Sequence, residues 1–198
     1  MEHLILHPTS TAQWQALIKD ASVFSSIKLP EDLESYLVFL LMRFAENPEM
    51  VHSILALDFL QSLEKLGKER QDKLRDVGDK CLLFAGLFPG RARKRRVRIS
   101  YFVKLGQSAY ASLSESSSRN PKELASLFSE LCLHFVGLMD VLQTTRELEE
   151  NQASLDPLQA EELWSDTKSL HALQTLKRIT HGLPIGYTLL PSSPHQKH

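Results

Sequence analysis

Apolar residues recur at intervals of three and four along nearly the whole chain, and no segment alternates apolar and polar residues like a half-buried strand. Such intervals place side chains on one face of an α-helix. The longest run of this kind comprises Leu124, Leu127, Phe128, Leu131, Phe135, Leu138, Met139 and Leu142. The spacing therefore predicts an all-α protein, folded as a bundle that buries one face of each helix.

Turn-forming residues divide this pattern into about seven helices within a single domain. We expect helices over approximately residues 10–24, 30–46, 48–66, 68–88, 98–116, 121–149 and 157–182, and the last region has a candidate break near Ser165-Asp166. The helical domain accordingly spans residues 1–182. Residues 183–198 contain three prolines and are predicted to form an irregular, frayed tail.

Three of these segments indicate what lies in the core. The first helix has one apolar face, formed by Trp14, Leu17, Ile18, Ala21 and Phe24. Residues 81–88 are apolar on every side of the helix, so other elements should enclose them. The helix over 98–116 should bury Ile99, Phe102, Val103, Gly106, Tyr110 and Leu113, and the small Gly106 would admit a second backbone closely.

Composition places the chain among ordinary globular proteins rather than disordered ones, with 42% hydrophobic and 24% charged residues. Cys81 and Cys132 lie among apolar neighbours and are predicted to be free thiols. The apolar run Leu4–Leu6 is too short for a signal-peptide core, and no stretch approaches the roughly 18–20 apolar residues that span a bilayer. We therefore expect a cytoplasmic protein without a transmembrane segment.

Charge is concentrated in one short run, although the formal net charge of the chain is only −1. Residues 91–98, RARKRRVR, carry six positive charges, on Arg91, Arg93, Lys94, Arg95, Arg96 and Arg98. Like charges so close together must be solvated, paired with acids or bound to an anion. Residues 140–166 hold eight acids against one base and are one possible partner, within the molecule or between copies.

Three interpretations of the basic run remain open. It is a solvated turn or pairs with the chain's own acids, it binds an external anionic partner, or it binds nucleic acid. Nucleic acid is the least favoured, because only Tyr101 and Phe102 are close enough to stack on bases and no known nucleic-acid motif accompanies the run. The candidate anion-binding residues are Arg91, Arg93, Arg95, Arg96, Arg98 and Tyr101.

Metal-binding patterns are sparse in this sequence. Di-iron helical bundles combine two Glu-x-x-His pairs with further glutamates, and this chain has one such pair, Glu49 and His52. His134 lies between two apolar residues, four positions after Glu130, where it could ligate haem, act as an acid or base, or bond to the glutamate. Glu49, His52 and His134 are therefore the candidate metal ligands, and no cofactor is evident.

Residues 79–110 resemble a block of uncharacterised bacterial all-helical proteins. The features that carry the resemblance are Leu82-Leu83, Gly86, Phe88-Pro89, Arg91, Arg95-Arg96, Tyr101-Phe102, Gly106 and Ala109-Tyr110. The resemblance implies a bacterial origin and a helical fold, and it transfers no catalytic residue because that family has no assigned activity.

The chain has no phosphate-binding loop, no dinucleotide-binding glycine pattern, no nucleophile elbow and no Cys-x-x-Cys pair. We therefore expect a non-enzymatic binding or assembly protein that self-associates through a helical face, with an arginine-rich helical hairpin as its recognition element. The alternative is a helical enzyme or ligand-binding protein, of haem-oxygenase or metal-dependent kind, that uses His134 or His52.

Overall fold

The computed structural model describes residues 10–52, 55–94, 96–116, 122–150 and 153–180. This part of the chain contains ten α-helices, one 3₁₀ segment and no strand, so the all-α prediction is confirmed. The elements are α1 (Ser10–Ser25), α2 (Glu31–Glu46), the 3₁₀ segment η1 (Pro48–His52), α3 (Leu55–Leu63), α4 (Gly67–Leu87), α5 (Pro89–Lys94), α6 (Ile99–Ser116), α7 (Lys122–Leu133), α8 (Phe135–Glu150), α9 (Pro157–Thr167) and α10 (Leu170–Thr180). The predicted tail, residues 183–198, lies outside the described residues.

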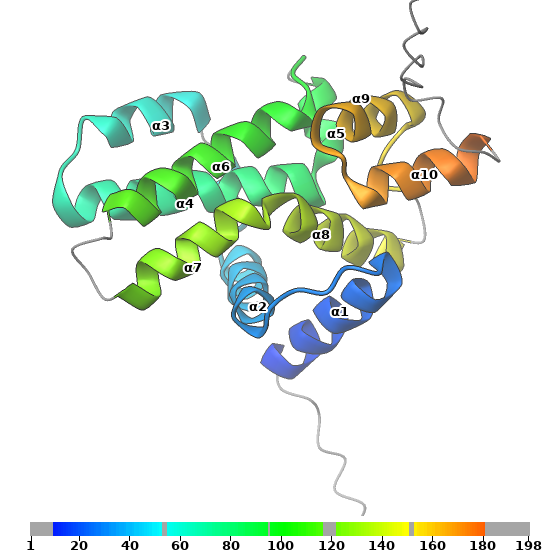
Figure 1. The fold of residues 1–198 in the computed structure, drawn as a ribbon, viewed down its shortest axis with the longest axis horizontal. Helices are drawn as coiled ribbons and strands as arrows, with labels where there is room; N and C mark the ends of the chain where they lie inside the picture. Colours follow the sequence, from blue (N-terminus) through cyan, green and yellow to red (C-terminus); the bar gives the residue numbers. More distant parts are fainter. Residues whose placement is uncertain (1–9, 53–54, 95, 117–121, 151–152, 181–198) are drawn as a thin grey trace, which may run out of the picture.

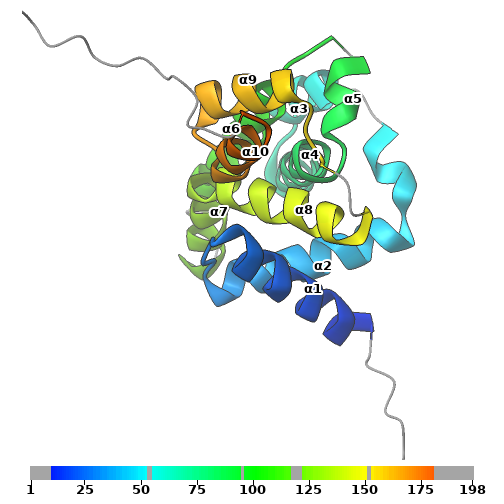
Figure 2. The ribbon, with the colours of Figure 1, turned by 90° about the vertical axis from the view of Figure 1, so that its right-hand side faces the viewer.

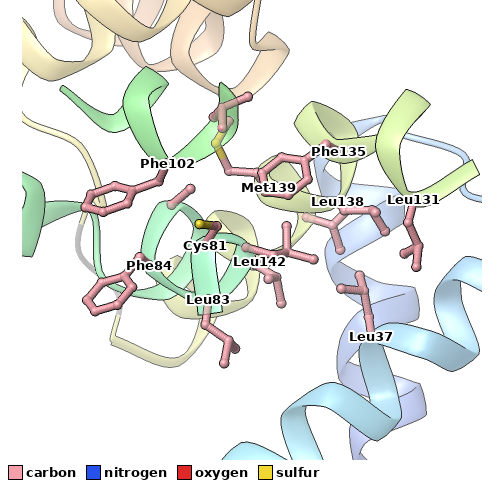
Figure 3. Packing of buried hydrophobic residues seen from close by; sticks show 14 of the residues in the cluster. Leu37, Cys81, Leu83, Phe84, Phe102, Leu131, Phe135, Leu138, Met139 and Leu142 are labelled. Carbon is pink, nitrogen blue, oxygen red and sulfur yellow. The ribbon is translucent and has the colours of Figure 1, made fainter. Parts of the chain in front are cut away.

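Helices α4 and α6 lie side by side, with α3 and α8 packed on α4 and α7 and α9 packed on α6 (Figures 1 and 2). Their close approach depends on Gly106, as its position in the sequence predicted. A Cβ atom at Gly106 would collide with the ring of Phe135 and lie 2.9 Å from Cys81 Cβ. Figure 3 shows Cys81, Phe102 and Phe135 gathered at this junction. All six residues predicted for the buried face of the 98–116 helix are buried.

Helix α8 closes the far end of α4. Residues 81–86 of α4 are fully enclosed, as their uniformly apolar character predicted. The carbonyls at the end of a helix lack partners within it. The side chain of Gln143 donates to the carbonyl of Ala85 (2.9 Å), and that of Arg146 donates to the carbonyl of Leu87 (3.0 Å). Donors from α8 thus satisfy the end of α4 where Pro89 stops it.

The prediction of one long helix over residues 121–149 is wrong. The segment forms α7 and α8, which meet at His134 with a bend of 68°. The apolar spacing continues through the bend, and Leu131, Phe135 and Leu138 are all fully buried. Helix α7 packs on α6, whereas α8 packs on α1 and α4, so the bend keeps both halves of one apolar face on the core.

Other differences from the predicted elements have local causes. The segment 48–66 is divided into η1 and α3, and Pro89-Gly90 begins the short α5 as well as ending α4. The predicted region 157–182 is divided into α9 and α10 shortly after the candidate break near Ser165-Asp166, because Lys168 adopts a left-handed conformation (φ 61°) that ends α9. Phe24 does not lie in the core as predicted; its side chain is 72% exposed at the end of α1.

Asp79 is a charged residue within this core, with only 1% of its surface exposed. Its Oδ1 accepts hydrogen bonds from the hydroxyls of Tyr36 (2.6 Å) and Tyr110 (2.7 Å). Its Oδ2 accepts a short hydrogen bond from Arg43, and Arg75 Nε lies 3.7 Å away. Burial, together with the adjacent carboxylate, raises the pKa of both tyrosines, so they remain hydrogen-bond donors. One carboxylate therefore joins α2, α4 and α6.

Among the described residues, no single helix has the length and apolar character needed to cross a membrane. The bent α7–α8 pair passes this test only when the two helices are taken together, by length and composition alone.

Replacing Asp79 by alanine should strongly destabilise the fold, because two buried hydroxyls and the Arg43 guanidinium would lose their common acceptor. Removing one partner of a buried ion pair costs about 3–5 kcal/mol. Urea denaturation followed by circular dichroism measures this loss of unfolding free energy.

Asp76→Ala is the matched control. Asp76 lies 3.9 Å from the same arginine, but its side chain is 54% exposed. We expect its replacement to change the free energy of unfolding by less than about 1 kcal/mol. Equal losses in the two variants would contradict the importance of burial at Asp79.

Candidate functional site

The arginine run forms α5 and the turn that leads into α6. Arg91 lies over the ring of Phe88, with its guanidinium carbon 4.6 Å from the ring centre. This cation–π contact fixes Arg91 against the molecule rather than extending it into solvent. Arg93 lies in α5, but its side chain and the whole of Arg95 are outside the described residues.

Arg96 occupies a position at which glycine is the usual residue. Its φ angle is 55°, and the N–H of Val97 bonds back to the carbonyl of Ala92 (3.1 Å), which closes the end of α5. The left-handed conformation costs a side-chain-bearing residue roughly 1 kcal/mol or more. The Arg96 side chain is exposed and makes no ion pair with any described residue.

Arg98, in contrast, pairs with the acidic segment of its own chain. Its guanidinium lies 3.5 Å from Glu162 and 3.4 Å from Asp166, both on α9. The Ser100 hydroxyl also donates to Asp166 (2.7 Å). The Ser100 hydrogen bond, with the charge of Arg98, lowers the pKa of Asp166. Intramolecular pairing, one of the alternatives for the basic run, is therefore confirmed for Arg98.

A groove of about 300 Å³ lies between this turn and α9. Arg96, Arg98 and Glu162 line it together with apolar side chains, including Val97 and Leu158. Leu158 is 64% exposed and contributes apolar surface to the groove. Tyr101, the remaining candidate of this set, packs edge-on against Phe102 and is 39% exposed. The structure thus places Arg96 and Arg98 together on one groove that also has an apolar wall.

The candidate metal ligands are not brought together in the described part of the chain. His134 lies at the α7–α8 bend, half-exposed, with Nε2 3.2 Å from Glu130. It therefore makes the ordinary bond to a neighbouring carboxylate that its spacing allowed. Glu49 lies in η1, and the side chain of His52 is outside the described residues. Among the described residues, no three His, Cys, Asp or Glu side chains are placed to hold a metal ion.

A second polar cluster, which the sequence did not indicate, joins α8 to α10. His171 is buried, and its Nε2 lies 3.0 Å from Glu147 Oε1, while Nδ1 lies 3.3 Å from the Thr144 hydroxyl. Arg178 donates to the other oxygen of Glu147 (3.2 Å). The backbone N–H of Ser154 also donates to Oε1 (2.8 Å). Glu147 is therefore held by donors from two segments of the chain, α10 and the residues that precede α9.

Burial alone would raise the pKa of Glu147. The hydrogen bonds from His171 and Ser154 and the charges of His171 and Arg178 outweigh it and lower that pKa to about 2. Asp140 lies about two helical turns before Glu147 on α8, and its pKa is shifted in the opposite direction. Burial raises the pKa of Asp140 to about 6, although the Ser169 hydroxyl (2.6 Å) and the N–H of Leu170 (2.9 Å) donate to it. Asp140 thereby caps the N-terminus of α10.

A cavity of about 340 Å³, which is open to solvent on one side, adjoins this cluster. Its wall includes Phe24 from α1, Thr144 and Glu147 from α8, and His171, Gln174, Lys177 and Arg178 from α10. Figures 1 and 2 show how these helices meet, with α8 between α1 and α10. The cavity depends on tertiary packing, because its walls are separated by more than a hundred residues in sequence.

One sequence signal could have indicated part of this cluster. Asp140 occurs between Met139 and Val141, on a helix whose neighbours are apolar, and an acid in such a position needs partners. The sequence gives no comparable signal for His171, because it predicts that a helix spans this region but not which face of that helix is buried.

Comparisons with protein-family models, with curated proteins and with solved structures find no match to this chain. The resemblance of residues 79–110 to uncharacterised bacterial proteins therefore stays a prediction.

The replacement Glu147→Gln should alter how stability depends on acid. The folded pKa of Glu147 is lowered to about 2 from 4.5, so its stabilising contribution is present above pH 4.5 and lost as the pH falls toward 2. The wild-type advantage over the variant should shrink by roughly 3 kcal/mol across that interval. Urea denaturation at a series of pH values measures it.

Asp140→Asn serves as a control of opposite sign. The folded pKa of Asp140 is raised from 3.8 to about 6, so the folded protein takes up a proton that the unfolded chain does not. Wild type should gain stability relative to this variant, by roughly 3 kcal/mol, as the pH falls from 7 to 4. If the difference in unfolding free energy between wild type and variant changed with pH in the same direction for both variants, the opposite pKa shifts of Glu147 and Asp140 would be contradicted.

Proposed function

We propose that the protein is a non-enzymatic binding protein, which recognises a carboxylate-bearing segment of a protein partner through the α5–α6 turn and the groove beside α9. Arg96 is the observation that carries this proposal. It is exposed, it makes no ion pair with the described residues, and it lines the groove. A cation in this position can bond to a carboxylate through two parallel N–H groups.

The backbone of Arg96 gives further support. Arginine occupies a left-handed helix end at a cost that glycine would avoid. Strained positions of this kind persist where another role offsets the cost. Ser26 and Lys168 are also left-handed, but Lys168 contacts the ring of Trp164 at 4.8 Å, whereas Arg96 is directed to no described partner.

The rest of the groove favours a peptide segment over a simple ion. Val97 and Leu158 provide an apolar wall beside the cations, and the exposed part of Leu158 would be covered by an apolar side chain of the partner. The groove is lined by two cations, Arg96 and Arg98, and by two acids, Asp156 and Glu162, and Arg98 is already paired with Glu162 and Asp166, so the groove carries no net positive charge. A uniformly charged nucleic-acid backbone fits this mixture less well than an acidic and apolar peptide.

Arg96→Gly should separate stability from binding. The variant relaxes the left-handed position, so its free energy of unfolding should stay constant or rise by up to about 1 kcal/mol. Its affinity for a fluorescein-labelled octaglutamate peptide, measured by fluorescence anisotropy, should fall about threefold to tenfold, as expected for one exposed charge contact. Added salt should weaken wild-type binding, because exposed charges are screened.

Ser26→Gly is the matched control, since it relaxes the same conformation at the end of α1 (φ 57°) without touching the groove. It should leave peptide affinity unchanged. Undiminished binding of the peptide by Arg96→Gly would contradict the proposal. If wild type bound a labelled single-stranded oligonucleotide more tightly than the peptide, and Arg96→Gly lost that binding, the partner would be nucleic acid and not a protein.

A further inference from the structure

We propose that the cavity between α1, α8 and α10 is a second binding site, which takes a small organic monocarboxylate with an apolar body. This site is separate from the groove beside α9 and does not depend on the function proposed for it. The cavity, of about 340 Å³, falls within the range of small-molecule sites in proteins. Its floor is formed by buried polar residues, and its rim is formed by exposed side chains.

The floor of the cavity is rigidly held. Thr144 is 3% exposed and His171 is 2% exposed. His171 is fixed through both ring nitrogens, by Thr144 on one side and by Glu147 and Ser154 on the other. A site whose polar groups are already positioned loses little entropy when a ligand binds.

Arg178 is oriented by this floor. Its Nη2 donates to Glu147 (3.2 Å) and to the Thr175 hydroxyl (3.1 Å). A guanidinium has five N–H donors, so those on Nε and Nη1 remain for a ligand, and no described residue accepts from them. Each parallel pair of guanidinium N–H groups includes Nη2, so a carboxylate oxygen would accept a single charge-assisted hydrogen bond from Nε or Nη1 of Arg178.

The charge of the cavity favours an anion. Lys177 and Arg178 line its rim, and Glu147 is the one acid in its wall. Glu147 is already bonded to His171, Ser154 and Arg178. Even with His171 neutral, one positive charge is left in excess, which matches a monoanion better than a dianion or a cation.

Phe24 defines the remainder of the ligand. Its ring is 72% exposed at the end of α1 and forms one wall of the cavity. A buried aromatic residue would need no ligand, but this one leaves apolar surface open to water beside two cations. An apolar body attached to the carboxylate would cover the ring and gain free energy from the area removed from water.

The proposal is tested with 4-fluorobenzoate as the probe, by ¹⁹F NMR titration against the full-length protein. Wild type should bind it saturably, and 4-fluorobenzylamine, which has a similar shape and the opposite charge, should not bind. Lys177→Gln should weaken binding about threefold or more, and Phe24→Ala should weaken it further. Circular dichroism should show that both variants, altered at exposed positions, remain folded.

Lys68→Gln is the control, because Lys68 is an exposed lysine at the start of α4, at the end of the molecule away from α10 (Figure 1). It should bind the probe like wild type. The proposal is overturned if 4-fluorobenzylamine binds equally well, or if inorganic phosphate displaces the probe at equal concentration. It is also overturned if binding is absent from wild type or survives unchanged in both cavity variants.

Discussion

The buried carboxylate of Asp79 is the interaction on which the central helices depend. A charge enclosed by apolar residues is tolerated only with several partners, and here Tyr36 and Arg43 from α2 and Tyr110 from α6 supply them. The partners must approach from fixed directions, so the carboxylate determines how α2 and α6 are placed on α4. The apolar contacts at Gly106 supply buried surface area between the helices, and the hydrogen bonds of Asp79 fix the orientation of the helices relative to one another.

Helix α8 also uses carboxylates to hold a neighbouring helix in place. Asp140 caps α10, and Glu147 holds His171 and Arg178, so two acids of one helix fasten the last described helix to the core. Their surroundings differ: burial dominates at Asp140, whereas charged and hydrogen-bonding partners dominate at Glu147. The cavity beside Glu147 follows from this attachment, since its walls come from α1, α8 and α10.

Each of the two candidate sites contains two neighbouring cations that differ in their ion pairing. At the α5–α6 turn, Arg98 is committed to the acids of α9 and Arg96 is left exposed. At the α8–α10 cavity, Arg178 is committed to Glu147 and Lys177 remains at the rim. In both places one cation is paired with acids of its own chain, and the neighbouring cation makes no ion pair with a described residue.

Local periodicity and turn chemistry determined the helical class, the extents of α2, α4 and α6, and the burial of residues such as Phe102 and Tyr110, because each depends on neighbours within a few positions. The bend at His134, the exposure of Phe24 and the partner of Arg98 could not be predicted in the same way. They depend on which helices pack together, and periodicity does not specify that. The cluster of Glu147, His171 and Arg178 was decided by tertiary structure alone, since its members meet only when α10 docks on α8.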